Sequence, residues 1–435
     1  MTLGSDGDGM ADRVYEARRR RVVEAAMPTA ATTLRDRRLI YAAALLRGLA
    51  AGAISVLAAV YLAKRGFQEA EIGLVLSAGM AGVLAGTVYG TFVAERVGRR
   101  RSLVALALLA SAGGIALAWS GSLWSVLVAA FVGMLNTQGA DRGAAQALEQ
   151  SILPETTDDA ERTRVFAWYN ALADTGGALG ALLAALPALL RDRLAWREAA
   201  AYDTTILVYA ALLAGAALVY ALLSAAAERG RSRTAGEHAL PPSAKREVHR
   251  FAWLSGMDAV GGGFISSALI AYFLFVRFGV SESALALLFA AGRVVTVLSH
   301  FAAAWLARRI GLVNTMVFTH IPSSLLLLTL PIAPTFPVAA LLFILREGLS
   351  EMDVPTRQSY LMAIVPPHER AWAAGLSQLA RAGGRMIAPA FAGAAMQAGA
   401  LWLPLVAGAS IKIAYDLLLW SAFRRIRPPE ERAPA

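Results

Sequence analysis

The chain has 435 residues, of which 57% are hydrophobic and 17% are charged, and its formal net charge is +10. This composition is too apolar and too sparsely charged for an ordinary soluble protein, so lipid is the expected solvent of most of the fold. The sequence contains no cysteine, which excludes a disulfide framework, a thiolate zinc site and a cysteine nucleophile.

The first 38 residues form a basic tail that includes the run Arg18 to Arg21. The tail lacks the short apolar core and the small-residue cleavage site of a signal peptide, so we expect it to be retained in the cytoplasm. Beyond it, apolar stretches long enough to span a bilayer, about 20 residues each, recur along nearly the whole chain. These stretches are continuous rather than alternating, which favours helices over a β-barrel.

The sequence therefore predicts an all-α integral membrane protein with twelve transmembrane helices. A hydrophilic interruption at 227–250 is interpreted as a flexible cytoplasmic linker. It separates an N-terminal six-helix bundle at 39–226 from a C-terminal six-helix bundle at 251–423, and a cytoplasmic tail follows at 424–435. The expected helices are 39–63, 72–95, 102–120, 122–152, 163–190, 202–226, 251–276, 283–307, 312–333, 337–365, 370–396 and 399–423.

Lysine and arginine are distributed unevenly over the predicted loops. With the N-terminus inside, the cytoplasmic segments hold 27 of these residues and the outside loops hold 6. Cytoplasmic loops of membrane proteins carry an excess of Lys and Arg, so both termini and the linker are predicted to be cytoplasmic. We expect a monomeric, multi-pass protein of the cell (inner) membrane.

Two segments of the first half recur in the second half. The run Glu95 to Gly98 after the second helix corresponds to the run Arg308 to Gly311 after the eighth helix, 213 residues later. Asp141 and Gln146 in the fourth helix correspond to Asp353 and Gln358 in the tenth, 212 residues later. Parallel repeats of this kind predict two pseudo-symmetric bundles.

Residues 95–101 resemble the signature loop between the second and third helices of the major facilitator superfamily. Glu95 stands where that family usually has aspartate, and Thr91 holds the position of its first glycine. The resemblance covers about residues 38 to 425 and implies a secondary transporter. It also implies a cytoplasmic gate in which an acid at a helix end pairs with nearby bases. The expected gate residues are Glu95, Arg96, Gly98 and Arg99, with Arg308 and Arg309 as the weaker second copy.

The fifth helix contains Gly176, Gly177 and Gly180. This run resembles the glycine-rich stretch of the antiporter branches of the family, with Gly177 in place of the usual proline and Ala181 in place of the last glycine. The resemblance implies export. The family's arginine in the fourth helix would fall near Leu135 and is absent.

Charged side chains at bilayer depth cost at least about 2.5 to 3.5 kcal/mol each, so they usually face the interior of the bundle. The predicted helices hold eight bases and eight acids at such positions, and equal numbers favour ion pairs between helices for much of the set. Lys412 and Asp416 lie four residues apart and are expected to pair on one face. Glu149 is expected near the cytoplasmic end of its helix, in contact with water.

Asp258 and Asp174 are the leading candidates for a proton-coupling site. Each lies deep in a predicted helix just before a glycine cluster, and a desolvated carboxylate holds a proton more readily than one in water. Pairing with Arg381 or Arg385 is the structural alternative. Asp141 and Asp353 are the next candidates.

The candidate substrate contacts are basic or amide side chains in the predicted helices. Arg381 and Arg385 lie one turn apart and, with Arg47, could face an anion; pairing with Asp174 or Glu347 is the alternative. Gln146 and Gln358 either contact the substrate or belong to a hydrogen-bond network at the helix ends.

The remaining patterns exclude several other functions. The five histidines are scattered without the spacing of metal ligands. No phosphate-binding glycine loop is present, which argues against ATP-driven transport. The chain also lacks a soluble domain with a basic face, which nucleic-acid binding would require. We expect no enzymatic activity and no bound cofactor or metal. The leading hypothesis is proton-coupled export of amphipathic or drug-like solutes by alternating access. The alternatives are transport of an organic anion and a lipid-moving or sensing role without solute coupling.

Overall fold

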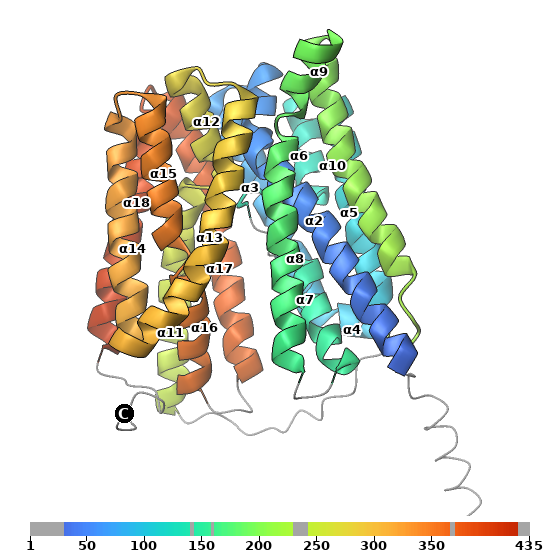
Figure 1. The fold of residues 1–435 in the computed structure, drawn as a ribbon, viewed down its shortest axis with the longest axis vertical. Coiled ribbons are helices and arrows are strands. Elements are labelled where there is room, and N and C mark those ends of the chain that lie inside the picture. Colours follow the sequence, from blue (N-terminus) through green and yellow to red (C-terminus); the bar gives the residue numbers. More distant parts are fainter. Residues whose placement is uncertain (1–29, 140–142, 158–160, 229–241, 366–369, 425–435) are drawn as a thin grey trace, which may run out of the picture.

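The computed structural model describes residues 30–139, 143–157, 161–228, 242–365 and 370–424, and within them the regular structure is entirely helical. We call helices α2 to α10 the first half and helices α11 to α18 the second half; they stand side by side in Figure 1. The first half contains α2 (Ala30–Lys64), α3 (Glu69–Phe92), α4 (Ala94–Val97), α5 (Arg99–Trp119), α6 (Leu123–Val132), α7 (Ala144–Ile152), η1 (Leu153–Thr156), α8 (Arg162–Leu183), α9 (Leu186–Leu194) and α10 (Glu198–Ala221). The second half contains α11 (Pro242–Phe264), α12 (Ser267–Phe278), α13 (Glu282–Ile310), α14 (Leu312–Thr329), η2 (Leu330–Ile332), α15 (Phe336–Ser350), α16 (Asp353–Ile364), α17 (Arg370–Gln397) and α18 (Leu403–Phe423).

The predicted membrane-spanning segments fall on helices. Among the described residues, nine helical stretches are long and apolar enough to cross a membrane. The predicted segments 122–152, 337–365 and 370–396 fall on α6 with α7, α15 with α16, and α17, which are not among these nine. An all-helical membrane fold is therefore confirmed, whereas the count of twelve spans stays a prediction.

The prediction of one continuous helix at 122–152 is wrong. Helix α6 ends at Val132 and α7 begins at Ala144, so the backbone leaves the helical path within the bundle. Met134 has φ 50° and Gly139 has φ 78°, values that suit glycine and are uncommon for other residues. The predicted helices 251–276 and 337–365 are also interrupted, between α11 and α12 and between α15 and α16.

Glycines let α2 and α8 approach each other closely. A Cβ atom added to Gly176 would lie 2.5 Å from the Leu45 carbonyl oxygen, and one added to Gly180 would lie 2.1 Å from the Leu49 carbonyl oxygen. Small residues at helix interfaces permit this backbone contact inside a membrane. The glycine-rich stretch in the fifth predicted helix is thus a packing surface within the first half.

A similar contact joins the two halves. A Cβ added to Gly393 of α17 would lie 2.2 Å from the Glu69 carbonyl oxygen at the start of α3. Nearby, the Ser77 hydroxyl of α3 accepts the Ala390 backbone N–H of α17 at 2.9 Å. Close backbone packing therefore fixes how α3 and α17 sit against each other.

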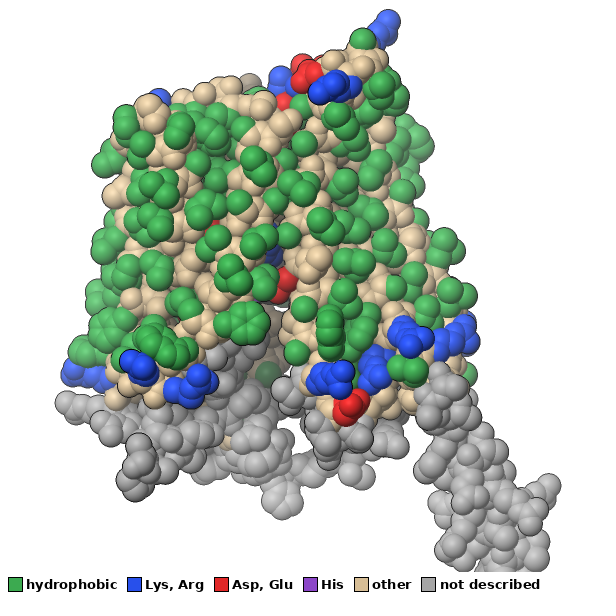
Figure 2. All heavy atoms as spheres, in the orientation of Figure 1, with side chains coloured by type: hydrophobic (Ala, Val, Ile, Leu, Met, Phe, Trp, Pro, Cys, Tyr) green, Lys and Arg blue, Asp and Glu red, His purple; other side chains and the backbone are tan. Residues whose placement is uncertain are grey.

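We name the two ends of the bundle by their elements. At the linker end, α2 begins, α10 ends, α11 begins and α18 ends, and at the α9 end the short helix α9 rises above its neighbours (Figure 1). Blue Lys and Arg side chains edge the linker end in Figure 2, while green apolar side chains cover the flanks. The membrane side that each end faces and the domain boundaries given above stay predictions. The predicted linker is not flexible throughout, however, because α11 already begins at Pro242.

We predict that Gly180→Ala destabilises the protein and that Gly177→Ala does not. The new methyl group at 180 meets a carbonyl oxygen, whereas one at 177 has its nearest atoms at 3.8 Å. Overpacking costs about 1 to 3 kcal/mol, which exceeds the helix-propensity gain of about 1 kcal/mol. Thermal unfolding of the two purified variants in detergent measures the difference. Equal midpoints for both variants would show that the α2–α8 contact relaxes without cost.

Candidate substrate cavity

A polar cavity, about 750 Å³ when the space open to solvent is included, lies in the second half, against the segment that joins α6 to α7. Helices α11 to α18 supply nearly all of its wall, and Gln138 of the first half completes it. Figure 2 shows the surface hollowed between the two halves, with charged side chains inside the hollow. The charged residues that line the cavity are Arg293, Arg346, Arg381, Arg385 and Lys412, with Asp258, Glu347, Glu351 and Asp353.

Asp258 is the centre of the charged wall. The residue is 2% exposed, and its carboxylate accepts Lys412 Nζ at 2.7 Å and Arg381 Nη1 at 2.7 Å. Arg357 Nη1 lies 3.5 Å from the same carboxylate. Three cations from α16, α17 and α18 thus converge on one acid of α11, which compensates its loss of hydration. This arrangement is the structural alternative that the sequence left open for Asp258.

His320 of α14 extends this network and was not singled out by the sequence pattern. Its Nδ1 lies 2.9 Å from an Asp416 carboxylate oxygen, and its Nε2 lies 3.1 Å from Lys412 Nζ. Lys412 therefore bonds His320 and Asp258 rather than Asp416, so the pair predicted within the last helix is wrong. The two residues are four apart, but each side chain turns to a partner on another helix.

The other predicted residues in this half have different surroundings. Asp353 is 4% exposed and pairs with Arg357 on the same helix, α16. Arg385 of α17 lines the cavity next to the Arg381 network. Asp141 and the side chain of Gln358 lie outside the described residues, so the predicted symmetric Asp and Gln pairs stay a prediction.

Arg293 of α13 reaches across to the first half. Its Nη2 donates to the Gly139 carbonyl oxygen at 2.5 Å. Gly139 lies in the interrupted segment between α6 and α7, where a carbonyl is free of helical bonding. This contact joins the halves at the cavity wall.

The first half contains a smaller charged cluster around Glu149 of α7. Glu149 is fully buried, which corrects the expectation that it contacts water. Arg47 Nη2 lies 2.8 Å from its carboxylate, and the hydroxyls of Tyr169 and Tyr220 donate to it at 2.7 Å and 2.6 Å. The predicted substrate contact Arg47 thus has a structural partner, although not Asp174 or Glu347 as proposed.

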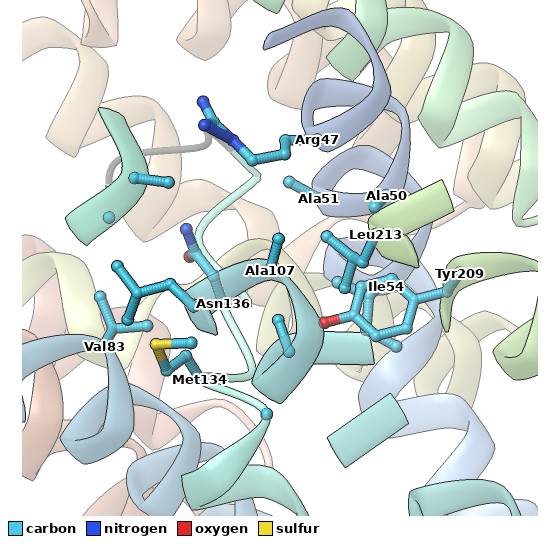
Figure 3. Close-up of a pocket in the computed structure, with 15 residues that line it drawn as sticks. Arg47, Ala50, Ala51, Ile54, Val83, Ala107, Met134, Asn136, Tyr209 and Leu213 are labelled. Atoms are coloured by element: carbon cyan, nitrogen blue, oxygen red, sulfur yellow. The ribbon is translucent and has the colours of Figure 1, made fainter. Parts of the chain in front are cut away.

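An apolar pocket, about 640 Å³ when the space open to solvent is included, lies beside this cluster in the first half. Figure 3 shows Ile54 of α2, Tyr209 and Leu213 of α10, and Met134 and Asn136 of the interrupted segment around it, with Arg47 at one side. The interrupted segment thus contributes Asn136 to the apolar pocket and Gln138 to the polar cavity. The interrupted segment therefore has an apolar pocket on its first-half side and a charged cavity on its second-half side.

The two halves are tied together at the α9 end. Arg191 of α9 binds Glu282 of α13 with two bonds, at 3.0 Å and 3.1 Å, and Tyr202 of α10 also donates to Glu282. The Tyr272 hydroxyl of α12 donates to Glu69 of α3 at 2.9 Å. Bidentate Arg–carboxylate pairs are strong and directional. We call the Arg191, Tyr202 and Glu282 group the α9-end latch.

The predicted gate residues lie at the linker end. Arg99 is 4% exposed and binds Glu95 at 3.1 Å and Glu155 at 2.8 Å, so it joins α4, α5 and η1 within the first half. Gly98 has φ 115°, a value that favours glycine at this turn. The remaining predicted gate residues are exposed: Arg96, Arg308 and Arg309. A role for the set in gating stays a prediction.

Asp174 and Gln146 lie apart from the charged network. Asp174 is partly exposed on α8, and Gln146 is partly exposed on α7. The structure therefore brings Asp258, Asp353, Arg381 and Arg385 together around one cavity, and it places Asp174, Gln146 and Arg47 elsewhere.

Two halves of apolar helices, latched at one end, with a charged cavity in the second half that reaches the first half at Gln138, have the arrangement of a secondary membrane transporter. Residues 40–389 match the model of the Major Facilitator Superfamily. The chain belongs to this family. It is 25% identical over 421 residues to an uncharacterized membrane protein of Saccharomyces cerevisiae, YJR124C, in a match that covers 89% of this chain and 94% of that protein.

Solved transporter structures share the fold. A bacterial homolog of the human lysosomal transporter Spinster has a TM-score of 0.72 at 16% identity, covering 92% of this chain and 98% of that chain. The nucleoside transporter NupG gives 0.71 at 14% identity, with 89% and 99% covered. A D-xylose–proton symporter gives 0.69 at 14% identity, with 89% and 97% covered. At these identities the similarity shows the fold alone.

We predict that Asp258→Asn lowers stability strongly and that Lys412→Met added to it restores part of the loss. Asn leaves the buried cations without their shared carboxylate, and breaking a buried pair costs about 3 to 5 kcal/mol. Removing one of the stranded charges relieves part of this cost. Thermal unfolding of the single and double variants measures both effects, with Asp174→Asn as the control on a partly exposed acid. An Asp258→Asn midpoint equal to that of the control would contradict the role of Asp258 as the centre of the network.

Proposed function

We propose that the protein moves a small amphipathic organic solute with an anionic group across the membrane, by proton-coupled alternating access. The observation that carries the proposal is the pairing of a charged cavity, in which five bases and four acids line the wall, with an apolar pocket across the same segment. The bases suit a carboxylate or phosphate, and the apolar pocket suits a hydrocarbon part. Drug-like compounds of this type fall within the class.

The distribution of contacts between the halves supports alternating access. The α9-end latch and the Tyr272–Glu69 bond join the halves at one end, and Figure 2 shows a hollow between them nearer the linker end. Two bundles that rock about a mid-depth site expose it first to one side and then to the other. Proton coupling and export are part of the proposal. The support for export is the glycine-rich stretch 176–182, which in the structure packs against α2.

We predict that anionic amphiphiles bind the purified protein and that Arg385→Gln weakens this binding by about tenfold, which corresponds to about 1.4 kcal/mol. Arg385 lines the cavity, so its loss removes one donor to the anion. A thermal-shift screen over anionic, cationic and neutral amphiphiles identifies binders, and pH-sensitive dye in reconstituted vesicles then tests solute-driven proton movement.

The matched control for this experiment is Arg277→Gln, which removes an exposed arginine at the end of α12. It should leave binding unchanged. Preference for cationic compounds would overturn the anion assignment. Binding without any solute or proton flux would favour the alternative of a sensing or lipid-moving protein.

The α9-end latch gives a second prediction. Glu282→Gln removes the charge that Arg191 and Tyr202 bind, so the halves should separate more often at this end. Spin labels at Leu189 and Ile332, exposed positions on α9 and η2, report the distance between the halves; the chain has no native cysteine to interfere. We expect a longer-distance population in Glu282→Gln and none in Glu198→Gln, whose acid pairs with Lys64 at a more exposed site. An unchanged distance distribution in both variants would show that the latch does not hold the halves.

A further inference from the structure

We infer that His320, held by Asp416, binds the coupling proton; this inference rests on the proposed proton-coupled transport and locates its proton site. His320 is 2% exposed and Asp416 is fully buried. His320 nevertheless contributes to the wall of the polar cavity, so a proton that enters the cavity can reach the ring. Neither residue was among the acids that the sequence suggested as proton carriers.

The partners of His320 indicate which ring nitrogen carries a lone pair and can take a proton. An ammonium group has only donors, so the contact of 3.1 Å from Lys412 Nζ requires a lone pair on Nε2. The proton of the neutral ring therefore sits on Nδ1, where Asp416 accepts it from 2.9 Å. Histidine changes charge near neutral pH more readily than any other side chain, and here the nitrogen that would take the proton is Nε2, once Lys412 has left it.

Helix α15, which packs against α14, contributes the Arg346–Glu347 pair to the cavity wall, and the two charges of that pair cancel. The other charged groups around the ring come from four helices. Besides Asp416 and Lys412 of α18, they are Asp258 of α11, Asp353 and Arg357 of α16, and Arg381 of α17, while the Tyr415 ring stands edge-on to the imidazole at 6.1 Å. Three acids face three permanent cations in this group. The set is neutral when His320 is neutral, which is the condition that burial favours.

Protonation of Nε2 and the Lys412 contact exclude each other. A proton on Nε2 turns the acceptor into a donor and places a second positive charge beside the ammonium, so Lys412 must leave the ring. Lys412 also lines the cavity and holds Asp258 at 2.7 Å. Proton binding at His320 thus displaces a positive charge along the cavity wall and changes the charge that a solute meets there.

The inference is tested without a known solute by following the separation of the halves as pH changes. Spin labels at Trp168 on α8 and Phe301 on α13, both exposed, report the distance between the halves in the full-length protein in vesicles. We expect the wild-type distance distribution to shift between about pH 5 and pH 8, the range in which histidine titrates. His320→Gln and Asp416→Asn should each abolish the shift or move its midpoint by a full pH unit or more.

Two matched substitutions serve as controls. His300→Gln makes the same change at another histidine, on α13, and Asp174→Asn matches the Asp416 variant at a partly exposed acid on α8; both should keep the wild-type shift. Two independent variants at the proton site keep the test valid if one of them does not fold. A shift that survives in a folded His320→Gln or Asp416→Asn protein, that disappears in Asp174→Asn, or that is absent in the wild type would overturn the inference. None of these results depends on solute flux, so a failure of this inference can be distinguished from a failure of the proposed transport function.

Discussion

The cost of burying charge away from water is the constraint on which the second half of the molecule depends. Asp258 could not stay ionised inside a helical membrane protein without partners, and it gathers Lys412, Arg381 and Arg357 from three other helices. Each of these cations then needs its own acids, which brings Asp353 into the network, while His320 and Asp416 complete it around Lys412. The relative rotation of α11, α14, α16, α17 and α18 follows from satisfying this set of charges.

The first half meets the same constraint in a different way. Its fully buried acid Glu149 has one charged partner, Arg47, and otherwise accepts bonds from the hydroxyls of Tyr169 and Tyr220, while Asp36 of α2, also buried, accepts from Ser224. A single pair with two neutral donors leaves the neighbouring surface free for apolar residues, and the pocket in Figure 3 is apolar. The two related halves therefore present chemically different walls, which suits a solute that is itself part polar and part apolar.

The sequence predicts the helices well because their signal is local. Long apolar stretches and hydrophilic interruptions are visible without any knowledge of the fold, and most helix ranges follow from them. The break between α6 and α7 was missed, although Gly133, Asn136, Gly139 and Gly143 mark it in the sequence. Glycine within apolar helices is common in membrane proteins, so hydropathy alone could not separate a break from a packing glycine.

The ion pairs were harder to predict because they depend on which helices touch. Charge counting favoured ion pairs between helices for much of the intramembrane set, and Asp258 with Arg381 was among the pairs considered. Asp416 was predicted as the partner of Lys412 because spacing along one helix is visible in the sequence. The approach of α14 and α11 to Lys412 on α18 is not visible there. His320 looked isolated for the same reason, since its partners lie 92 and 96 residues away in the chain.

The interrupted helices explain how the halves can share a site and still move. Irregular backbone at membrane depth is tolerated where it lines a cavity or is buried in protein, and here two such breaks face each other: the Thr137 carbonyl oxygen accepts the Ala268 N–H at 3.4 Å, and the Gly139 carbonyl oxygen accepts Arg293. These bonds cross between the halves, whereas the close glycine contacts of α2 with α8 lie within one half. A rocking motion can therefore preserve the packed interior of the first half while it exchanges the contacts at the break and the α9-end latch. Because Arg293 also lines the cavity, a bound anion that draws its guanidinium from Gly139 would weaken one of the bonds that hold the halves in the present arrangement.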